Sequence, residues 1–170
     1  TLLKSPHTKG RNLPKLNNLF YYPARIPASA TRAVTLAALL PDRVSKDDFL
    51  NALGMQILSN YVNSIGYLAT LYMVNPDRDL VKKLVGRDPS DVVVVDPMAG
   101  GGSIPLEAKR LGFTVIAGDY NPMSYLLLRA TVEFPAKYGR RLCDLVNREA
   151  KKLIEYVRGE LGKYYPEDGK

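Results

Sequence analysis

The stretch from Val92 to Asp119 constrains the fold most, because it reads as a strand, a glycine-rich loop, a helix and a second strand. Val92–Val95 is a run of four β-branched residues, and a continuous apolar run between turn signals is typical of a strand buried on both faces of a parallel sheet. Phe113–Asp119 supplies the second strand. Parallel neighbours need a crossover connection, so the sequence predicts a βαβ unit.

The crossover helix is expected over Ile104–Gly112. Pro105 stands in its first turn and Gly112 at its end, where each residue type is favoured. Glu107 is expected to face solvent on this helix. The loop before the helix lies at the carboxyl edge of the sheet, where α/β folds bind ligands, and glycines there let a ligand approach the backbone.

Two carboxylates flank this loop. Asp96 ends the first strand, where it could meet a ligand's amino group, and Asp119 ends the second, where it could accept hydrogen bonds from ribose hydroxyls. The alternative is a tight turn without a ligand, with both aspartates as helix caps. No lysine follows the glycines, which disfavours a Walker-type ATP site, and Pro105 stands where a dinucleotide motif needs its third glycine.

The string Asp-Pro-Met-Ala-Gly-Gly-Gly-Ser, which begins at Asp96, resembles the Asp-Pro-Phe-x-Gly-x-Gly-Ser/Thr motif of amino-methyltransferases that modify adenine or cytosine N4. The resemblance implies S-adenosyl-L-methionine as the cofactor. It places the methionine portion along the first loop, the ribose at Asp119 and the adenine beside the residues that follow. The cofactor-binding residues that it implies are Asp96, Pro97, Ala99, Gly100, Gly101, Gly102, Asp119, Tyr120, Asn121 and Pro122.

A second, looser match lies upstream. Tyr22–Pro27 is similar to a His-Pro-x-x-Lys-Pro element of these enzymes, with Tyr22 in place of the histidine and Arg25 in place of the lysine. It implies that Tyr22 and Pro23 contact the methionine end of the cofactor. Val92–Gly139 looks closest to a largely archaeal group of adenine-specific DNA methylases with a zinc-ribbon insert, so the likeness spans most of the chain.

The chain departs from these enzymes in one respect that bears on activity. It contains no Asp/Asn-Pro-Pro-Tyr/Phe motif, which in such enzymes orients the target amine and stacks on the flipped base. Cys143 is its only cysteine and His7 its only histidine, which leaves too few ligands for a zinc site. Cys143 is expected to be a buried packing residue. In the family, both missing elements would lie beyond Lys170.

Two hypotheses for function follow. In the first, the chain is the cofactor-binding part of a DNA (adenine-N6 type) methyltransferase, a truncated chain or split-gene product whose catalytic residues are unknown and which needs a second chain for activity. In the second, it is a non-catalytic nucleic-acid-binding or regulatory subunit that kept the fold. RNA or protein as methyl acceptor also stays open.

The expected fold is α/β: a Rossmann-like class I methyltransferase with a central, mostly parallel but incomplete sheet, helices on both faces and a helical N-terminal extension. Residues 1–27 form a basic extended arm and 28–170 the domain, divided into a helical portion (28–90), the βαβ unit (91–122) and further helices (123–165). The 28–90 portion begins with a helix over Ala28–Leu40 and continues with an amphipathic region from Phe49 to Tyr72. The last helix, Arg141–Tyr164, is expected to turn Leu142, Leu145, Val146, Leu153, Ile154, Val157 and Leu161 inward.

A net charge of +7 and a pI near 9.5 favour a polyanionic partner, DNA rather than RNA. The arm mixes aromatic residues with cations that suit nucleic acid, although the same aromatics could pin the arm onto the domain. Those cations are Lys9, Arg11, Lys15 and Arg25. Apolar runs are too short for a membrane span and no secretory signal is seen, so a cytoplasmic location is expected.

Overall fold

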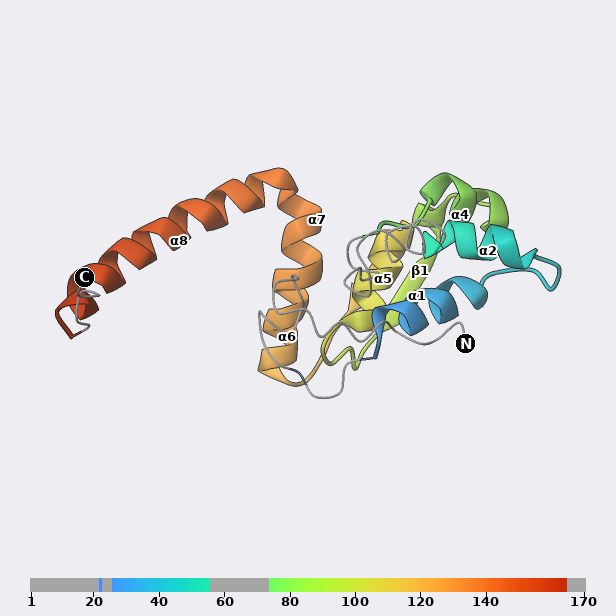
Figure 1. Cartoon of the computed structure of the whole chain (residues 1–170). Helices are drawn as coiled ribbons and strands as arrows, with labels where there is room; N and C mark the ends of the chain where they lie inside the picture. Colours follow the sequence, from blue (N-terminus) through green and yellow to red (C-terminus); the bar gives the residue numbers. More distant parts are fainter. Residues whose placement is uncertain (1–21, 23–25, 56–73, 165–170) are drawn as a thin grey trace. The chain divides into compact units, whose positions relative to one another are not determined.

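A computed structural model describes residues 22, 26–55 and 74–164 of the chain (Figure 1). Its regular elements are mostly helical, with two short strands. In order they are α1 (Ala28–Ala37), α2 (Lys46–Ala52), α4 (Arg78–Val85), the 3₁₀ turn η4 (Pro89–Asp91), β1 (Val93–Asp96), α5 (Ser103–Leu111), β2 (Thr114–Ala117), α6 (Pro122–Leu128), the π-helical turn η5 (Arg129–Glu133), α7 (Phe134–Tyr138), α8 (Arg140–Leu161) and η6 (Gly162–Tyr164).

The chain divides into two compact units, one ending at Val132 and the other beginning at Glu133. The first unit contains the βαβ arrangement that the sequence predicts. β1 and β2 pair in parallel, with Val93 opposite Thr114 and Asp96 opposite Ala117. The crossover helix α5 packs on both strands, and α1 packs on α5. The described residues form a two-stranded sheet, and the larger Rossmann-like sheet remains a prediction from the sequence.

Local capping signals fix where several helices begin and end. The Asp77 carboxylate accepts hydrogen bonds from the first N–H groups of α4, and Gly86 ends that helix in a left-handed conformation with φ 75°. Ser45 caps α2 in the same way as Asp77 caps α4. Gly112 ends α5 with φ 101°, a conformation that strongly favours glycine. The end of α5 at Gly112 agrees with the sequence analysis.

The core of the first unit lies between α1, α2, α4, α5 and one face of the sheet. Its buried apolar side chains come from the helices and from the residues that flank the strands, and Val94 and Val115 reach it from the strands themselves. They are Leu36, Ala52, Leu53, Val81, Val92, Ala108, Leu111 and Phe113.

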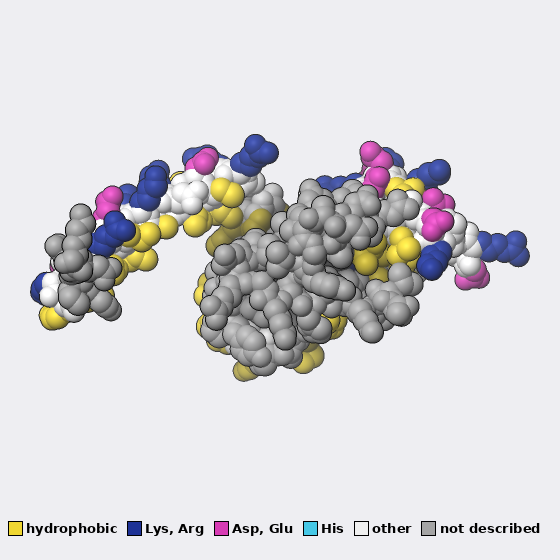
Figure 2. All heavy atoms as spheres, in the orientation of Figure 1, with side chains coloured by type: hydrophobic (Ala, Val, Ile, Leu, Met, Phe, Trp, Pro, Cys, Tyr) yellow, Lys and Arg dark blue, Asp and Glu magenta, His cyan; other side chains and the backbone are white. Residues whose placement is uncertain are grey.

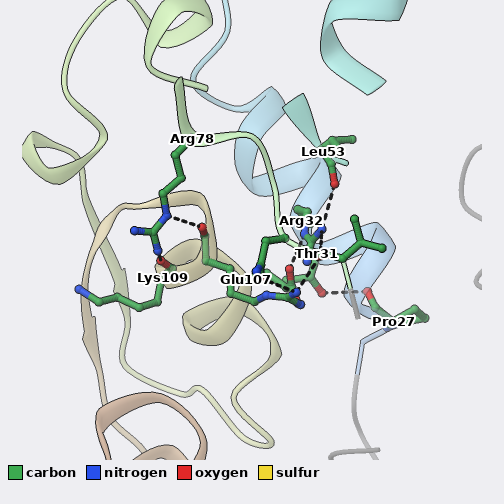
Figure 3. Close-up of polar contacts among 10 residues, drawn as sticks. Pro27, Thr31, Arg32, Leu53, Arg78, Glu107 and Lys109 are labelled. Atoms are coloured by element: carbon green, nitrogen blue, oxygen red, sulfur yellow. Dashed lines mark hydrogen bonds and ion pairs between the residues drawn. The ribbon is translucent and has the colours of Figure 1, made fainter. Parts of the chain in front are cut away.

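A buried ion pair also holds this core together (Figure 3). The Arg32 guanidinium of α1 contacts the Glu107 carboxylate of α5, and both side chains are fully buried. Arg32 Nη1 also donates to the carbonyls of Leu53 and Val74, at 2.9 and 3.0 Å. Burial lowers the pKa of Arg32, and Glu107 offsets part of that effect. The expectation that Glu107 faces solvent is therefore wrong, because α1 covers that side of α5.

The other face of the sheet is exposed. Val93 and Val95 of β1 are 53% and 62% exposed, and Ile116 of β2 is 59% exposed. The prediction of a first strand buried on both faces is wrong for this chain, because no described element covers these side chains.

The second unit consists of α7, α8 and η6. The side chains expected to turn inward along α8 are largely exposed, Leu153 by 62% and Val157 by 39%. Cys143 is exposed as well, contrary to expectation. Helical periodicity predicts that these residues share one side of α8, but the described elements that pack most on α8 in this unit are the short α7 and η6. Among the described residues, no helix combines the length and hydropathy that a membrane crossing requires.

Candidate functional site

Backbone hydrogen bonds fix the loop between β1 and α5, one to the residue after β2 and one within the loop. Ala99 N–H donates to the carbonyl of Gly118 just after β2, at 3.0 Å, and Gly102 N–H donates back to Ala99, at 2.8 Å. Gly100 and Gly102 have φ values of 53° and 78°, a region that residues other than glycine rarely adopt. The glycines are therefore required by the turn itself.

Gly100 also lets an aromatic ring approach. A Cβ on Gly100 would lie 3.3 Å from Cε1 of Tyr22, so the Tyr22 ring lies directly against the loop. Tyr22 is thus brought to the glycine loop from far away in the sequence. Gly102 points elsewhere, since a Cβ there would lie 3.1 Å from Cδ2 of Leu128 in α6.

The Asp119 carboxylate ties the two loops at the sheet edge together. One oxygen accepts a hydrogen bond from Gly100 N–H and the other accepts from Asn121 N–H, each at 2.7 Å. These bonds, Asn121 first and then Gly100, lower the pKa of Asp119, so it is a carboxylate at neutral pH. A carboxylate has about four acceptor sites, so further acceptor capacity remains for a ligand.

A cavity of about 350 Å³ opens at this edge of the sheet, within the range of small-molecule sites. The Asp96 carboxylate is among the lining groups and accepts a long hydrogen bond from Met98 N–H, at 3.4 Å. The cavity is lined by Tyr22, Ile26, Asp96, Met98, Ala99, Gly100, Gly101, Ser103, Ile104 and Asp119.

The first turn of α5 adds a polar group to this cavity. Ser103 lines it at the helix N-terminus, is 8% exposed, and its hydroxyl makes no hydrogen bond to the residues that the structure describes. A helix N-terminus favours anions. A buried hydroxyl without a partner at such a position suits a bound acceptor group.

The sequence-based candidates divide into three groups. Tyr22, Asp96, Ala99, Gly100, Gly101 and Asp119 line the cavity together. Pro97, Gly102, Tyr120, Asn121 and Pro122 are described but are not among the lining residues; Asn121 caps α6, Pro122 follows it in the first turn, and Tyr120 is fully exposed. Pro23, Lys9, Arg11, Lys15 and Arg25 lie outside the described residues, as do residues 56–72 of the predicted amphipathic region.

Sequence reasoning missed four lining residues, Ile26, Met98, Ser103 and Ile104. Ser103 could have been found, because it occupies the last position of the glycine motif. Met98 could have been found in the same way, since it occupies the Phe position of that motif. The two isoleucines carry no comparable signal, since an apolar residue in a loop or a first turn suits many environments.

Within the described ranges, no group of three or more His, Cys, Asp or Glu side chains is arranged to hold a metal ion. Comparison of the chain with protein-family models, with curated proteins and with solved structures finds no match.

Proposed function

We propose that this chain is the S-adenosyl-L-methionine-binding part of a DNA methyltransferase of the adenine-N6 type, acting in the cytoplasm. The observation that carries the proposal is the cavity at the carboxyl edge of β1 and β2, which joins Asp96, the glycine loop and Asp119 on one wall. A methyl donor supplies an already activated methyl group, so catalysis is mainly alignment of donor and amine. A site without a catalytic histidine or cysteine fits that chemistry.

The lining residues suggest how each part of the cofactor would be recognised. Asp96 would accept hydrogen bonds from the α-ammonium group, and Ser103 at the start of α5 would donate to the carboxylate. Asp119 would use its remaining acceptor sites for ribose hydroxyls. Tyr22, Ile26 and Met98 would exclude water from the wall of the cavity.

The exposed sheet face supports the further proposal that a second polypeptide completes the enzyme. Parallel sheets are normally covered on both faces, yet Val93, Val95 and Ile116 are exposed. A partner that covers this face and carries an Asp-Pro-Pro-Tyr-type motif would bring the amine-orienting groups to the cavity. The chain alone is expected to bind the cofactor and to methylate nothing.

Isothermal titration calorimetry with S-adenosyl-L-methionine tests the proposal on the chain as it stands. We expect micromolar binding that Asp119→Ala abolishes and that Asp96→Asn weakens by about tenfold, the value of one charge-assisted hydrogen bond. Asp91→Asn is the matched control, because this exposed aspartate precedes β1 at the opposite edge. Absence of any binding by the wild-type chain would sink the proposal.

The alternative function, a non-catalytic nucleic-acid-binding subunit, is favoured by the net charge of +7. A salt-dependent gel-shift or anisotropy titration with duplex DNA distinguishes the two. DNA binding without cofactor binding would support the alternative, whereas cofactor binding that responds to Asp96→Asn supports the enzyme.

A further inference from the structure

The wall of the cavity differs in charge from the chain as a whole. The chain has a net charge of +7, and Figure 2 shows many Lys and Arg side chains among the described residues. The cavity is lined instead by two carboxylates, Asp96 and Asp119, and none of its described lining residues is Lys, Arg or His. Two carboxylates without a cation on the same wall favour a ligand that carries positive charge.

An aromatic ring lies beside these carboxylates. Tyr22 is half-buried and lines the cavity, and a Cβ on Gly100 would lie 3.3 Å from its Cε1 and 3.4 Å from its Oη. Gly100 N–H in turn donates to Asp119 at 2.7 Å. The ring therefore packs against the part of the loop that bonds Asp119. An aromatic ring attracts a cation that lies within about 6 Å of its centre, so the ring and the two carboxylates favour the same kind of ligand.

The two carboxylates also indicate where the positive charge of the ligand would lie. In the proposed function, Asp96 accepts hydrogen bonds from the ammonium group of S-adenosyl-L-methionine, and Asp119 accepts them from its ribose. The sulfonium joins these two parts of the molecule, because it is bonded to the ribose on one side and to the methionine side chain on the other. It would therefore lie between the carboxylates and near the ring that packs on Gly100.

The product of methyl transfer differs from the donor only at this sulfur. S-adenosyl-L-homocysteine keeps the ammonium group, the carboxylate, the ribose and the adenine, but it has lost the methyl group and the positive charge on sulfur. A wall that stabilises the sulfonium distinguishes the two ligands. A wall that recognises only their common groups does not.

We propose that the cavity is selective for the charged methyl donor over its product, and that the Tyr22 ring determines this specificity together with the two carboxylates. The inference rests on the proposed function, because it takes the ligand to be S-adenosyl-L-methionine. It adds to that function a reason for the spent cofactor to leave: loss of the positive charge removes the attraction between the sulfur and the wall.

Isothermal titration calorimetry of the 170-residue chain with each ligand tests the selectivity. We expect the donor to bind about tenfold more tightly than the product, through a cation–π contact and the attraction of the carboxylates. Tyr22→Leu should reduce this ratio to about threefold, because the carboxylates remain. The ratio of the two affinities is the measurement, since a loss of packing would weaken both ligands alike.

Two further variants show whether the ring itself is responsible. Tyr22→Phe keeps the ring and should keep the ratio of the wild type. Ile26→Ala removes an apolar side chain from the same wall, and it should weaken both ligands by a similar factor and leave the ratio unchanged. A Tyr22→Phe variant without selectivity would assign the effect to the hydroxyl group and contradict the proposal.

A third ligand separates the charge from the methyl group. In sinefungin, a carbon that bears an ammonium group replaces the methylated sulfur, so the positive charge stays while the sulfur is absent. Tyr22→Leu should weaken the binding of sinefungin as it weakens that of the donor. A sinefungin affinity that does not respond to Tyr22→Leu would contradict recognition of charge by the ring.

Failure of this inference differs from failure of the proposed function. Absence of binding by either ligand would end the proposed function, and the selectivity with it. Equal affinity for donor and product, or tighter binding of the product by the wild-type chain, would overturn the selectivity alone. A ratio that Tyr22→Leu leaves unchanged would do the same for the role of the ring.

Discussion

The two faces of the β1–β2 sheet are made of the same residue types and differ in what lies over them. On one face, Val94 and Val115 pack against the core under α5. On the other, Val93, Val95 and Ile116 are more than half exposed. The sequence of β1 is almost uniform, so strand composition does not determine burial. The difference comes from the described helices, which cover one face only.

The first unit is therefore stabilised from one side. Its apolar core and its buried Arg32–Glu107 pair both lie on the α5 side of the sheet. Substitutions there should be severe, and matched substitutions on the open face should be nearly silent. The following predictions test that asymmetry.

The largest effect is expected from Arg32→Ala. It leaves Glu107 buried without its closest partner and removes the donor shared by the Leu53 and Val74 carbonyls. Losing one member of a buried pair costs about 3–5 kcal/mol of unfolding free energy, measured by urea denaturation. Arg148→Ala, in an exposed pair with Glu149, is the control and should change stability by less than about 1 kcal/mol.

A variant that removes both charges tests whether an unpaired buried charge causes the loss of stability in Arg32→Ala. Arg32→Met combined with Glu107→Leu should be less destabilised than Arg32→Ala, because no fully buried charge is left without a partner. Arg110, which also contacts Glu107 at 3.0 Å, keeps its hydrogen bonds to Val74 and Asn75. If the double variant is as unstable as the single one, the ion pair matters through its hydrogen bonds to Leu53 and Val74 and not through its charge.

Valine-to-alanine substitutions at a buried and at an exposed position in or beside β1 compare the two faces most directly. Val92, just before β1, is 5% exposed and Val95 is 62% exposed. Val92→Ala should cost about 2 kcal/mol by opening a cavity in the core, and Val95→Ala less than about 0.5 kcal/mol. Equal losses in urea unfolding would mean that the open face is covered in solution.

Substitution of two glycines by alanine distinguishes the cost of backbone strain from the cost of steric crowding. Gly86 and Gly102 have φ values of 75° and 78°. A Cβ on Gly102 would lie 3.1 Å from Leu128 Cδ2, whereas a Cβ on Gly86 would meet no described atom within 4 Å. Gly86→Ala should lose about 1 kcal/mol from left-handed backbone strain, and Gly102→Ala somewhat more. Thermal unfolding of the two variants side by side measures the difference.

The smallest effect concerns pH. The pKa of Asp119 is lower in the folded chain than its ordinary value, so its stabilising contribution is complete above about pH 4, the unfolded value, and is lost as pH falls through the lower folded value. The stability difference between the wild type and Asp119→Asn should therefore be constant from neutral pH to about pH 5 and shrink in stronger acid. Asp91→Asn, which removes an exposed carboxylate, is the control. A difference that grew on acidification would contradict the role of Asp119 as an acceptor from Gly100 and Asn121.

Local signals made the βαβ unit predictable. The β-branched run Val92–Val95 and the helix-ending Gly112 act within a few residues of themselves, so their effect can be read without knowing the fold. The proximity of Asp96 and Asp119 was also predictable, because each ends a strand and neighbouring parallel strands end at the same edge of a sheet.

Burial was not predictable in the same way. Glu107 lies on the helical face that α1 covers, and its partner Arg32 is 75 residues away. Cys143 and Leu153 lie on α8 and are exposed, because no described element of the second unit packs over them. Periodicity identifies which side of a helix is apolar, but the element that meets that side is a property of the whole assembly.

The Arg32 guanidinium also fastens two backbone segments that are distant from it in the sequence. One nitrogen donates to the carbonyls of both Leu53 and Val74, which are 21 and 42 residues away, and Asp77 N–H donates to Ala52 at 3.0 Å. A single side chain of α1 thus holds backbone from two other parts of the chain at one point of the core. Loss of Arg32 therefore removes a crosslink between these segments as well as one member of an ion pair.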